Sequence, residues 1–426
     1  MSTVSDKWST SLQYINGYWG SLIRHNPSDV KTLIGVPHPY MVPTNESVGG
    51  FTFNEQYYWD SYFMFLGLLG TEYEHFILGM TKNLAHLFQR WGVIPNANRA
   101  YFTSRSQPPF FTRMIWLCYE ILKRKQDPGA DDFLREMMLV AEEEHEQVWL
   151  GTQMPHIRLV HQGLSRYWDI NAGSNHIVCE SGWDLTTRCD FSRTWPTCLP
   201  VCLNSILYFR EIDMSRAFAS LGSHEASRRW STAAAKRCQT MTELMWDPEQ
   251  EIFLDYDFKK EARNPEPSLA CFYPLWAGLA TPQQAKVTVN RWLPQFERAG
   301  GLATTLEEAV ECNWAYPIGW APLQWLVVQG LDRYGFHDHA NRIREKWCAL
   351  VAAVLKDTGL MWEKYDVASI SAKTESGLYG QLPGFGWTCA IFKNFADVLS
   401  SGRVSSDPFF HLPESAELFS REAASS

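Results

Sequence analysis

Apolar residues recur at helical spacing along most of the chain. In the segment 8–24, one face of a helix with 3.6 residues per turn would carry Leu12, Ile15, Trp19 and Ile23. Alternation with a period of two is scarce, so few strands are expected. The predicted helices span 8–24, 57–69, 74–90, 111–125, 131–150, 199–212, 224–246, 267–279, 282–296, 322–330, 337–355 and 387–399.

These helices follow one another in pairs, joined by polar, glycine-rich or proline-rich loops. An all-α chain with this pattern fits a closed ring of helical hairpins, with the site in loops at one end. A helical-repeat solenoid is the alternative, but no fixed repeat length is visible. Asp338 is placed to cap the helix 337–355, and 255–258 is predicted as a short strand or hairpin. No low-complexity linker divides the chain, so 1–426 is predicted as a single domain, with a core of about 8–400 and a tail at 401–426.

Composition narrows the class of protein. The formal net charge is -9 with both signs interspersed, which disfavours a nucleic-acid partner. The first residues have no basic-then-apolar signal and no apolar run could span a bilayer, so we expect a cytoplasmic protein without a membrane partner. The ten cysteines are expected to be reduced; no CxxC pair occurs, and we expect no metal or other cofactor. The sequence leaves a homo-oligomer open.

The stretch Glu180-Ser-Gly-Trp-Asp184 carries the first candidate chemistry. A carboxyl beside an indole and partly out of water has a raised pKa, which suits proton donation. Hydrolysis of a glycoside needs such an acid, a second carboxylate and aromatic faces for the sugar ring. The second acidic stretch is Met361-Trp-Glu-Lys-Tyr-Asp366, and the chain has 19 Trp. A capped turn between helices is the plain structural alternative for 180–184.

Several further motifs resemble one family of proteins. Residues 49–62, GGFTFNEQYYWDSY, resemble the first trehalase signature, and 313–322, NWAYPIGWAP, resemble the second. The segments 104–109, 180–184, 363–366 and 384–388 match the same group in the same order, so the resemblance runs from about Leu33 to about Leu399. The group includes trehalases and the related mannosylglycerate and glucosylglycerate hydrolases. It implies an all-α (α/α)6 barrel and an inverting glycosidase.

The resemblance also implies roles for individual residues. Asp184 matches the general acid, and Glu363 matches the general base that activates water on the opposite face of the sugar. Trp59 and Asp60 match residues that hold the non-reducing sugar. Further candidate substrate contacts are Tyr58, Asn96, Arg105, Gln107, Gly182, Trp183, Trp314, Trp320, Tyr379 and Trp387. The structural alternatives are core packing for the tryptophans, a loop brace for Arg105, and an orienting or surface role for Glu180; Asp366 is expected to be structural.

Departures from the family pattern bear on the leaving group. Thr52 stands where trehalases carry an arginine, and Ala315 replaces an aspartate of the second signature. The Arg- and Glu-containing segment that holds the second glucose is absent from 163–176, and a glycine-rich lid is replaced at 369–377. A smaller, anionic leaving group would suit these changes, and a cation for its carboxylate could come from Arg166, Arg105, Lys373 or His176. The structural alternative for Arg166 is a brace of the loop before Asp184 through Asp169 or Glu180.

We therefore predict an enzyme that hydrolyses mannosylglycerate or glucosylglycerate to a hexose and glycerate. A trehalase with altered glucose contacts is the alternative. A catalytically silent sugar-binding or scaffold protein on the same fold is a third hypothesis, which the paired Asp184 and Glu363 disfavour because a binder has no need of a separate acid and base.

Overall fold

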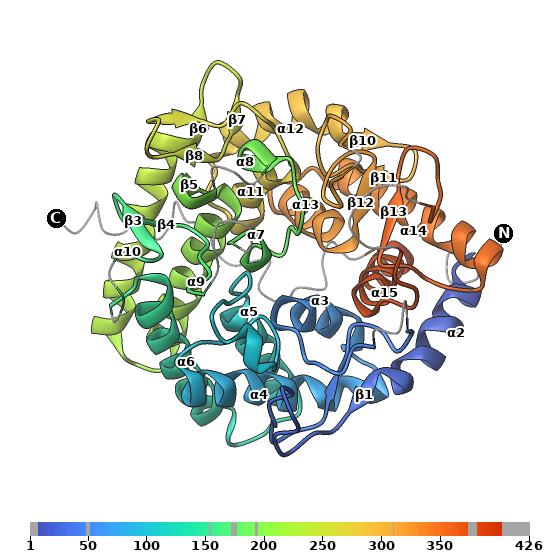
Figure 1. The fold of residues 1–426 in the computed structure, drawn as a ribbon, viewed down its shortest axis with the longest axis horizontal. Coiled ribbons are helices and arrows are strands. Elements are labelled where there is room, and N and C mark those ends of the chain that lie inside the picture. Colours follow the sequence, from blue (N-terminus) through green and yellow to red (C-terminus); the bar gives the residue numbers. More distant parts are fainter. Residues whose placement is uncertain are drawn as a thin grey trace.

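The computed structural model describes residues 7–47, 52–152, 154, 156–171, 177–191, 195–309, 311–373 and 381–402, and it is mostly helical. Six helices lie around a common centre in Figure 1, each packed against the next, and the last packs against the first. The circuit is therefore closed. Its members are α3 (Tyr58–Leu68), α5 (Phe111–Arg124), α9 (Val201–Ser220), α11 (Tyr273–Ala277), α13 (Ala321–Arg333) and α15 (Gly386–Ser401).

A second set of helices lies outside this circuit. Four of them pack on the inner helices that precede or follow them in the chain, as α10 does on α9 and α14 on both α13 and α15, and α2 packs on α15 (Figure 1). The outer helices are α2 (Ser9–Tyr18), α4 (His75–Trp91), α6 (Ala130–Glu144), α10 (His224–Met245), α12 (Pro282–Phe296) and α14 (His337–Thr358).

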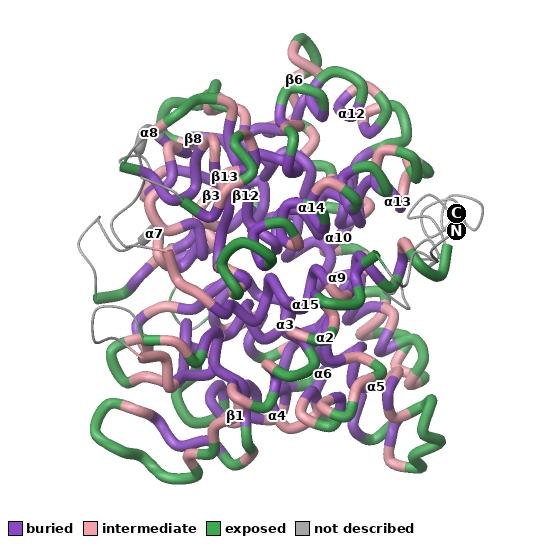
Figure 2. The backbone as a smooth tube through the Cα atoms, turned by 90° about the vertical axis from the view of Figure 1, so that its right-hand side faces the viewer, coloured by how far each residue is buried: buried purple, intermediate pink, exposed green. Residues whose placement is uncertain are grey.

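Burial explains which helices are inside. All residues of α3 are buried, as expected for a helix that is apolar on every side. By contrast, α14 is amphipathic, and its buried face includes the predicted residues Ile343, Trp347, Val351 and Val354. Figure 2 shows the same division, with buried chain through the centre and exposed chain at the periphery. Within the described part of the chain, no helix is long and apolar enough to cross a membrane.

The inner helix α9 also buries charged side chains, and each is paired. The guanidinium of Arg113 lies 3.0 Å from a carboxylate oxygen of Asp213, and that of Arg237 lies 2.8 Å from Glu211. Arg210 pairs with Glu144. A buried charge is tolerated when its partner and hydrogen bonds are supplied, so these pairs join α9 to the surrounding helices.

The strands are short and pair antiparallel in six small sheets among the described residues. The pairs are β1–β2, β3–β4, β6–β7, β10–β11 and β12–β13, and β8 lies between β5 and β9. Two short helices, α7 (Ile177–Glu180) and α8 (Arg188–Phe191), lie in the long segment between α6 and α9. The strands are β1 (Ile23–Arg24), β2 (Tyr40–Met41), β3 (Leu159–His161), β4 (Leu164–Ser165), β5 (Cys198–Leu199), β6 (Trp246–Asp247), β7 (Ile252–Phe253), β8 (Tyr256–Asp257), β9 (Ala262–Arg263), β10 (Glu297–Arg298), β11 (Gly301–Leu302), β12 (Ile318–Trp320) and β13 (Lys364–Asp366).

Five predicted elements differ from the structure. The helix predicted for 199–212 is α9, which continues to Ser220. The helix predicted for 8–24 ends at Tyr18, and a short 3-10 helix, Trp19–Leu22, leads into β1. The segment 131–150 is α-helical only to Glu144 and then forms one π-helical turn. The segment 267–279 is a 3-10 turn followed by α11, which has Pro274 in its first turn, where a proline is tolerated. Asp338 makes no cap: it lies in the first turn of α14, where its negative charge faces the positive helix end.

Candidate active site

A cavity of about 360 Å³ contains both predicted catalytic carboxylates. It is formed by the start of α3 and of α15, by the segments that follow α7 and precede β13, and by β12 with the segment before it. Segments far apart in sequence therefore meet in one place. The described residues that line the cavity are Pro43, Phe53, Tyr57, Trp59, Asp60, Gln107, Gly182, Asp184, Trp314, Trp320, Glu363, Leu382, Phe385 and Trp387.

Asp184 lies on a segment that a glycine and a backbone contact hold in place. Gly182 has φ +71°, and a Cβ at this position would lie 2.6 Å from the indole of Trp59, so only glycine fits without displacement. Just beyond Asp184, the backbone N–H of Trp314 donates to the carbonyl of Leu185 at 3.1 Å. The second tryptophan-rich motif thereby fixes the position of the acidic segment.

The environment of Asp184 favours its protonated form. Burial raises the pKa of Asp184 to about 6, and the negative charge of Glu363 adds to this effect, whereas Arg105 and a hydrogen bond from Cys179 act in the opposite direction. Oδ1 of Asp184 is buried and has no hydrogen-bond partner among the described residues. A carboxyl of this kind can hold a proton near neutral pH and give it to a substrate.

Glu363 directly precedes β13 and is 4% exposed. The ammonium of the buried Lys364 lies 3.1 Å from Oε2 of Glu363. The strand pairing of β12 with β13 sets Lys364 opposite Trp320, and the ammonium lies 5.3 Å from the centre of that indole ring. A fixed cation beside a carboxylate favours the ionised form, which is the form needed to accept a proton.

Tryptophans form one wall of the cavity as a continuous stack. The rings of Trp314 and Trp320 are 3.9 Å apart and parallel within 1°, and Trp183 stacks on Trp314 from behind at 5.4 Å. Trp387 meets both Trp59 and Trp320 edge to face, at 6.0 and 5.8 Å. Flat aromatic faces of this kind bind the apolar faces of sugar rings, so the wall suits a hexose.

Two polar side chains stand beside these aromatic walls. The backbone N–H of Trp59 donates to Oε1 of Gln107 at 3.1 Å, which fixes the amide of Gln107 at the cavity edge. Burial raises the pKa of Asp60 to about 8, with further contributions from the charges of Glu363 and Asp184. Asp60 is therefore largely neutral at pH 7 and can both donate and accept hydrogen bonds.

Glu180 does not line the cavity, although its segment carries Asp184. Its fully buried carboxylate accepts two hydrogen bonds from Arg158, at 2.5 and 3.1 Å. It also accepts the backbone N–H groups of Ser106, at 2.6 Å, and Trp168, at 2.5 Å. With four donors on two oxygens, Glu180 joins three loops around the site and has little capacity left for substrate.

Several predicted substrate contacts lie outside the cavity lining. The hydroxyl of Tyr58 accepts the N–H of Phe111 at 3.2 Å, because α3 begins at this residue and turns its side chain toward α5. Asn96 donates to the carbonyl of Cys179 at 3.3 Å, and its own carbonyl accepts the N–H of Tyr58. Trp183 is the rear member of the tryptophan stack.

Two of the predicted cations, Arg166 and Arg105, are also engaged elsewhere. Arg166 donates to the carbonyls of Ile157, His156 and Pro196 and lies over the ring of Trp168, so it braces loops through backbone oxygens. This differs from both predicted roles, a clamp for a carboxylate and a brace through acidic side chains.

Arg105 pairs with Asp169 at 3.0 Å, as its structural alternative predicts, although its charge still acts on Asp184. Tyr379 and His176 fall outside the described residues.

The sequence analysis missed some residues of the cavity. Tyr57 and Phe53 belong to the first signature, and both line the cavity. Phe385 does the same from the last motif. Lys364 was not predicted as part of the site, although it directly follows the predicted base in the sequence.

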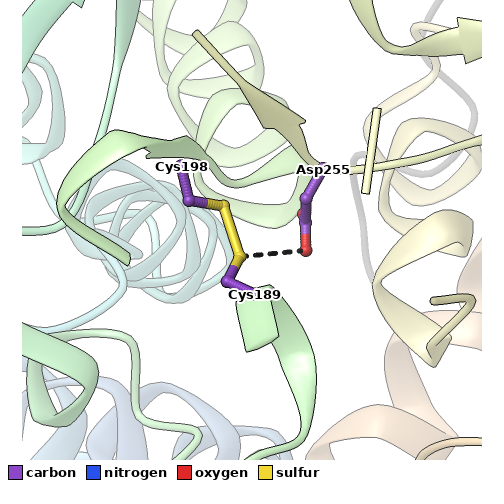
Figure 3. Close-up of side chains that lie close together, drawn as sticks. All are labelled: Cys189, Cys198 and Asp255. Carbon is purple, nitrogen blue, oxygen red and sulfur yellow. Dashed lines mark hydrogen bonds between the residues drawn. A yellow bond between two sulfur atoms is a disulfide. The ribbon is translucent and has the colours of Figure 1, made fainter. Parts of the chain in front are cut away.

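The cysteines next to the acidic segment are not all reduced. Cys189 and Cys198 form a disulfide with a Cα–Cα distance of 6.7 Å, and Sγ of Cys189 lies 3.9 Å from Asp255 (Figure 3). The prediction of reduced cysteines is therefore wrong for this pair, while the other eight cysteines are free. Asp255 is held by Arg188 at 2.8 and 3.0 Å, which accounts for its charge without a metal ion.

Comparison with known proteins shows that the chain is similar to several trehalases. A periplasmic trehalase from Xanthomonas oryzae pv. oryzae is 33% identical over 421 residues, which is 89% of this chain and 72% of the relative. A cytosolic neutral trehalase from Beauveria bassiana is 33% identical over 449 residues, covering 85% of this chain and 58% of the relative. The fold matches that of a neutral trehalase from Saccharomyces cerevisiae, with a TM-score of 0.77, 24% identity, and coverage of 98% of this chain and 99% of that one.

The chain is thus a glycoside hydrolase by its sequence relatives. More narrowly, the family model described as Trehalase matches residues 3–176 and 174–400, and the chain belongs to the trehalase family.

The same findings correct the predicted substrate. Hydrolysis of mannosylglycerate or glucosylglycerate is the wrong prediction, because the trehalase model covers nearly the whole chain and the trehalases compared are about one third identical. The mannosylglycerate hydrolase from Thermus thermophilus, solved in complex with glucose, is only 18% identical, with a TM-score of 0.65 and coverage of 93% of this chain and 99% of that one. That likeness is one of fold alone. The alternative, a trehalase, is the interpretation that the comparisons favour.

Proposed function

We propose that this protein hydrolyses trehalose to two molecules of glucose by an inverting mechanism. The observation that carries the proposal is the shared cavity of Asp184 and Glu363 between tryptophan walls, in a chain of the trehalase family. An inverting glycosidase needs two carboxyl groups with opposite protonation at the start of the reaction. The surroundings of Asp184 favour its protonated form, and those of Glu363 favour its ionised form.

Asp184 acts as the general acid in this proposal. Its raised pKa keeps a proton available for the glycosidic oxygen as the bond to the anomeric carbon breaks. Glu363 acts as the general base and takes a proton from the water that attacks the opposite face of the sugar. Lys364, at 3.1 Å, keeps Glu363 ionised and oriented, and is a positioning residue rather than a proton carrier. The separation expected for the two carboxyl groups, roughly 6.5–9.5 Å, stays a prediction.

The remaining cavity residues hold the first glucose. Trp59, Trp314 and Trp320 supply an aromatic surface for its ring, and Asp60 and Gln107 offer hydrogen bonds to its hydroxyl groups. Hydrogen bonds to substrate hydroxyls give large discrimination, because an analogue without the hydroxyl leaves a buried polar group unpaired. The cavity therefore favours a glucose unit over a purely apolar ligand.

We further propose that the closed circuit of inner helices with its outer partners is an (α/α)6 barrel, and that 1–426 folds as a single domain. The support is the contact of each inner helix with the next and of α15 with α3. The cytoplasmic location stays a prediction, since the trehalases compared include a periplasmic and a cytosolic protein.

Turnover of trehalose by purified variants tests the assignment. We expect Asp184→Asn and Glu363→Gln each to lower kcat on trehalose about a hundredfold or more, because each removes one proton transfer. Asp366→Asn is the matched control: its carboxylate caps a turn through the N–H groups of Ala368 and Ser369 outside the cavity. Activity of either catalytic variant near that of Asp366→Asn, with unchanged circular dichroism, would remove the acid and base from these positions.

A further inference from the structure

A second cavity, of about 370 Å³, lies beside β1 at the outer part of the molecule. It is formed by the loop between β1 and β2, by the first signature segment and by the segment before α5. The lining residues are Arg24, His25, Asn26, Val30, Lys31, Leu33, Tyr40, Asn54 and Arg99.

The lining of this cavity is cationic. Two arginines, a lysine and a histidine line it, and no Asp or Glu occurs among its described lining residues. Among the described residues, the guanidinium of Arg24 donates only to neutral acceptors: the carbonyls of Ser21 and Ile23, at 2.8 and 2.9 Å, and Oδ1 of Asn45, at 2.8 Å. Lys31 has no ion pair within the described chain. Within the part of the chain that the structure describes, the charges of Arg24 and Lys31 therefore have no compensating carboxylate, in a protein whose net charge is -9.

The nearby carboxylates are already neutralised. Glu55 is buried against Arg99, which also donates to Oγ1 of Thr32 at 2.9 Å. Asp29 pairs with Arg90 at 2.5 Å, and this hydrogen bond lowers the pKa of Asp29 to about 2. Neither acid is thus available to balance the charges that face the cavity.

The backbone holds the cationic groups in fixed positions. Arg24 lies opposite Tyr40 in the β1–β2 pair. Lys31 sits in a tight turn at φ +53°, which is closed by the reciprocal hydrogen bonds of Val30 and Leu33, at 2.9 and 3.0 Å. A residue other than glycine in this conformation is uncommon and is maintained only where its surroundings require it.

One neutral donor adds to this set. Nδ2 of Asn26 is buried and has no acceptor among the described residues. Buried donors are nearly always hydrogen-bonded, so an unpaired one in a cavity wall is available to an acceptor on a ligand.

From these observations we propose that the cavity lined by Arg24, Lys31 and Asn26 is a binding site for a phosphoryl-bearing anion. A guanidinium can bind two phosphate oxygens at once, and an ammonium and an amide supply further donors. The volume lies in the range of small-molecule sites and leaves room for more than a bare phosphate. The ligand is therefore either inorganic phosphate or a phosphorylated small molecule such as a sugar phosphate.

Calorimetric titration of the purified protein distinguishes these cases. The probes are inorganic phosphate, glucose 6-phosphate and glucose, at constant ionic strength, because surface electrostatics are screened by salt. We expect both phosphorylated probes to bind with a Kd of about 1 mM or lower. Equal affinity for the two would identify the phosphoryl group alone as the ligand, and tighter binding of glucose 6-phosphate would identify a sugar phosphate.

Charge variants locate the binding. Lys31→Glu, on an exposed side chain that does not enter the core, is expected to weaken binding of both phosphorylated probes by about tenfold or more, because a charge-assisted hydrogen bond is replaced by repulsion. Arg24→Gln should act in the same direction. Lys356→Glu, at the exposed end of α14, makes the same change of charge and should leave both affinities unaltered. The proposal is refuted if neither phosphorylated probe binds, or if Lys31→Glu and Lys356→Glu have the same effect.

Discussion

Replacing the ion pair of Arg105 and Asp169 by neutral side chains should extend the activity of the enzyme to higher pH, because Arg105 lies next to the proposed acid Asp184. Arg105 lowers the pKa of Asp184, which burial has raised to about 6. Asp184 must be protonated to act, so kcat/KM on trehalose should fall as the pH rises through about 6. The double variant Arg105→Gln/Asp169→Asn removes the cation together with its partner at 3.0 Å, and so leaves no buried charge unpaired.

The size of the shift follows from the usual effect of a nearby charge. An opposite charge within a few ångströms lowers a carboxyl pKa by about one to three units. We take about one unit, because Arg105 is shared with Asp169. Moving the pKa from about 6 to about 7 raises the protonated fraction at pH 8 from roughly 1% to roughly 9%, about 1.4 kcal/mol in free energy. Relative kcat/KM at pH 8 should therefore increase nearly tenfold.

The assay is a profile of log kcat/KM for trehalose against pH, which reports the pKa values of the free enzyme. The high-pH limb of the double variant should lie about one pH unit above that of the wild type. Arg166→Gln is the control, since Arg166 is engaged with backbone carbonyls and should leave the limb in place. A limb that stays where it is in the double variant, or that moves to lower pH, would refute the proposed electrostatic role of Arg105.

Two further predictions concern the support of the site. Gly182→Ala should lower kcat by about tenfold or more, because the added Cβ would lie 2.6 Å from Trp59 and displace the segment that carries Asp184. Steady-state kinetics measure kcat, and a melting curve measures the stability of the variant. An unaltered kcat at normal stability would contradict the packing argument. Glu180→Gln should lower the free energy of unfolding by about 3–5 kcal/mol, because it leaves Arg158 buried without its partner. Denaturant unfolding measures this loss. The control is Asp397→Asn, which removes an exposed ion pair with Lys393 and should lower the free energy of unfolding by about 1 kcal/mol or less. Equal losses in the two variants would refute the prediction.

The sequence predicted the helices well wherever one face is apolar and the other polar. The bounds of α12 were predicted to the residue, because Thr281 and Gln284 form a capping box that marks its start. Prediction was poorer at 8–24, where Gly17 and Gly20 weaken the helix, and at 131–150, where the helix changes its winding at His145.

The sequence predicted residues of the site that belong to short motifs. The two carboxylates and the tryptophans of the cavity all lie in such motifs, and the structure places them together in the cavity. Tyr57 and Tyr58 could not be told apart, because the choice depends on which residue begins α3. The partners of Arg166 are backbone carbonyls of distant loops, and no sequence pattern encodes them.

The leaving group was mispredicted for a related reason. The predicted leaving group rested on residues of the trehalase motifs that this chain lacks, such as the arginine replaced by Thr52. Absence of a contact in one loop does not determine which residues of other loops supply it. Arg166 and Arg105, two of the four cations predicted for a glycerate carboxylate, both brace loops instead, which removes the main positive evidence for an anionic leaving group.

The anomeric form of the glucose released first from trehalose tests the central claim most directly. Each trehalose contains two α-linked glucose units; water attacks one with inversion, and the other leaves with its configuration kept. Proton NMR in the first minutes, before mutarotation, should therefore show α- and β-glucose in equal amounts, and Glu363→Gln should show neither. Release of α-glucose alone would mean retention and a different role for Glu363, and failure to cleave trehalose would overturn the proposed function.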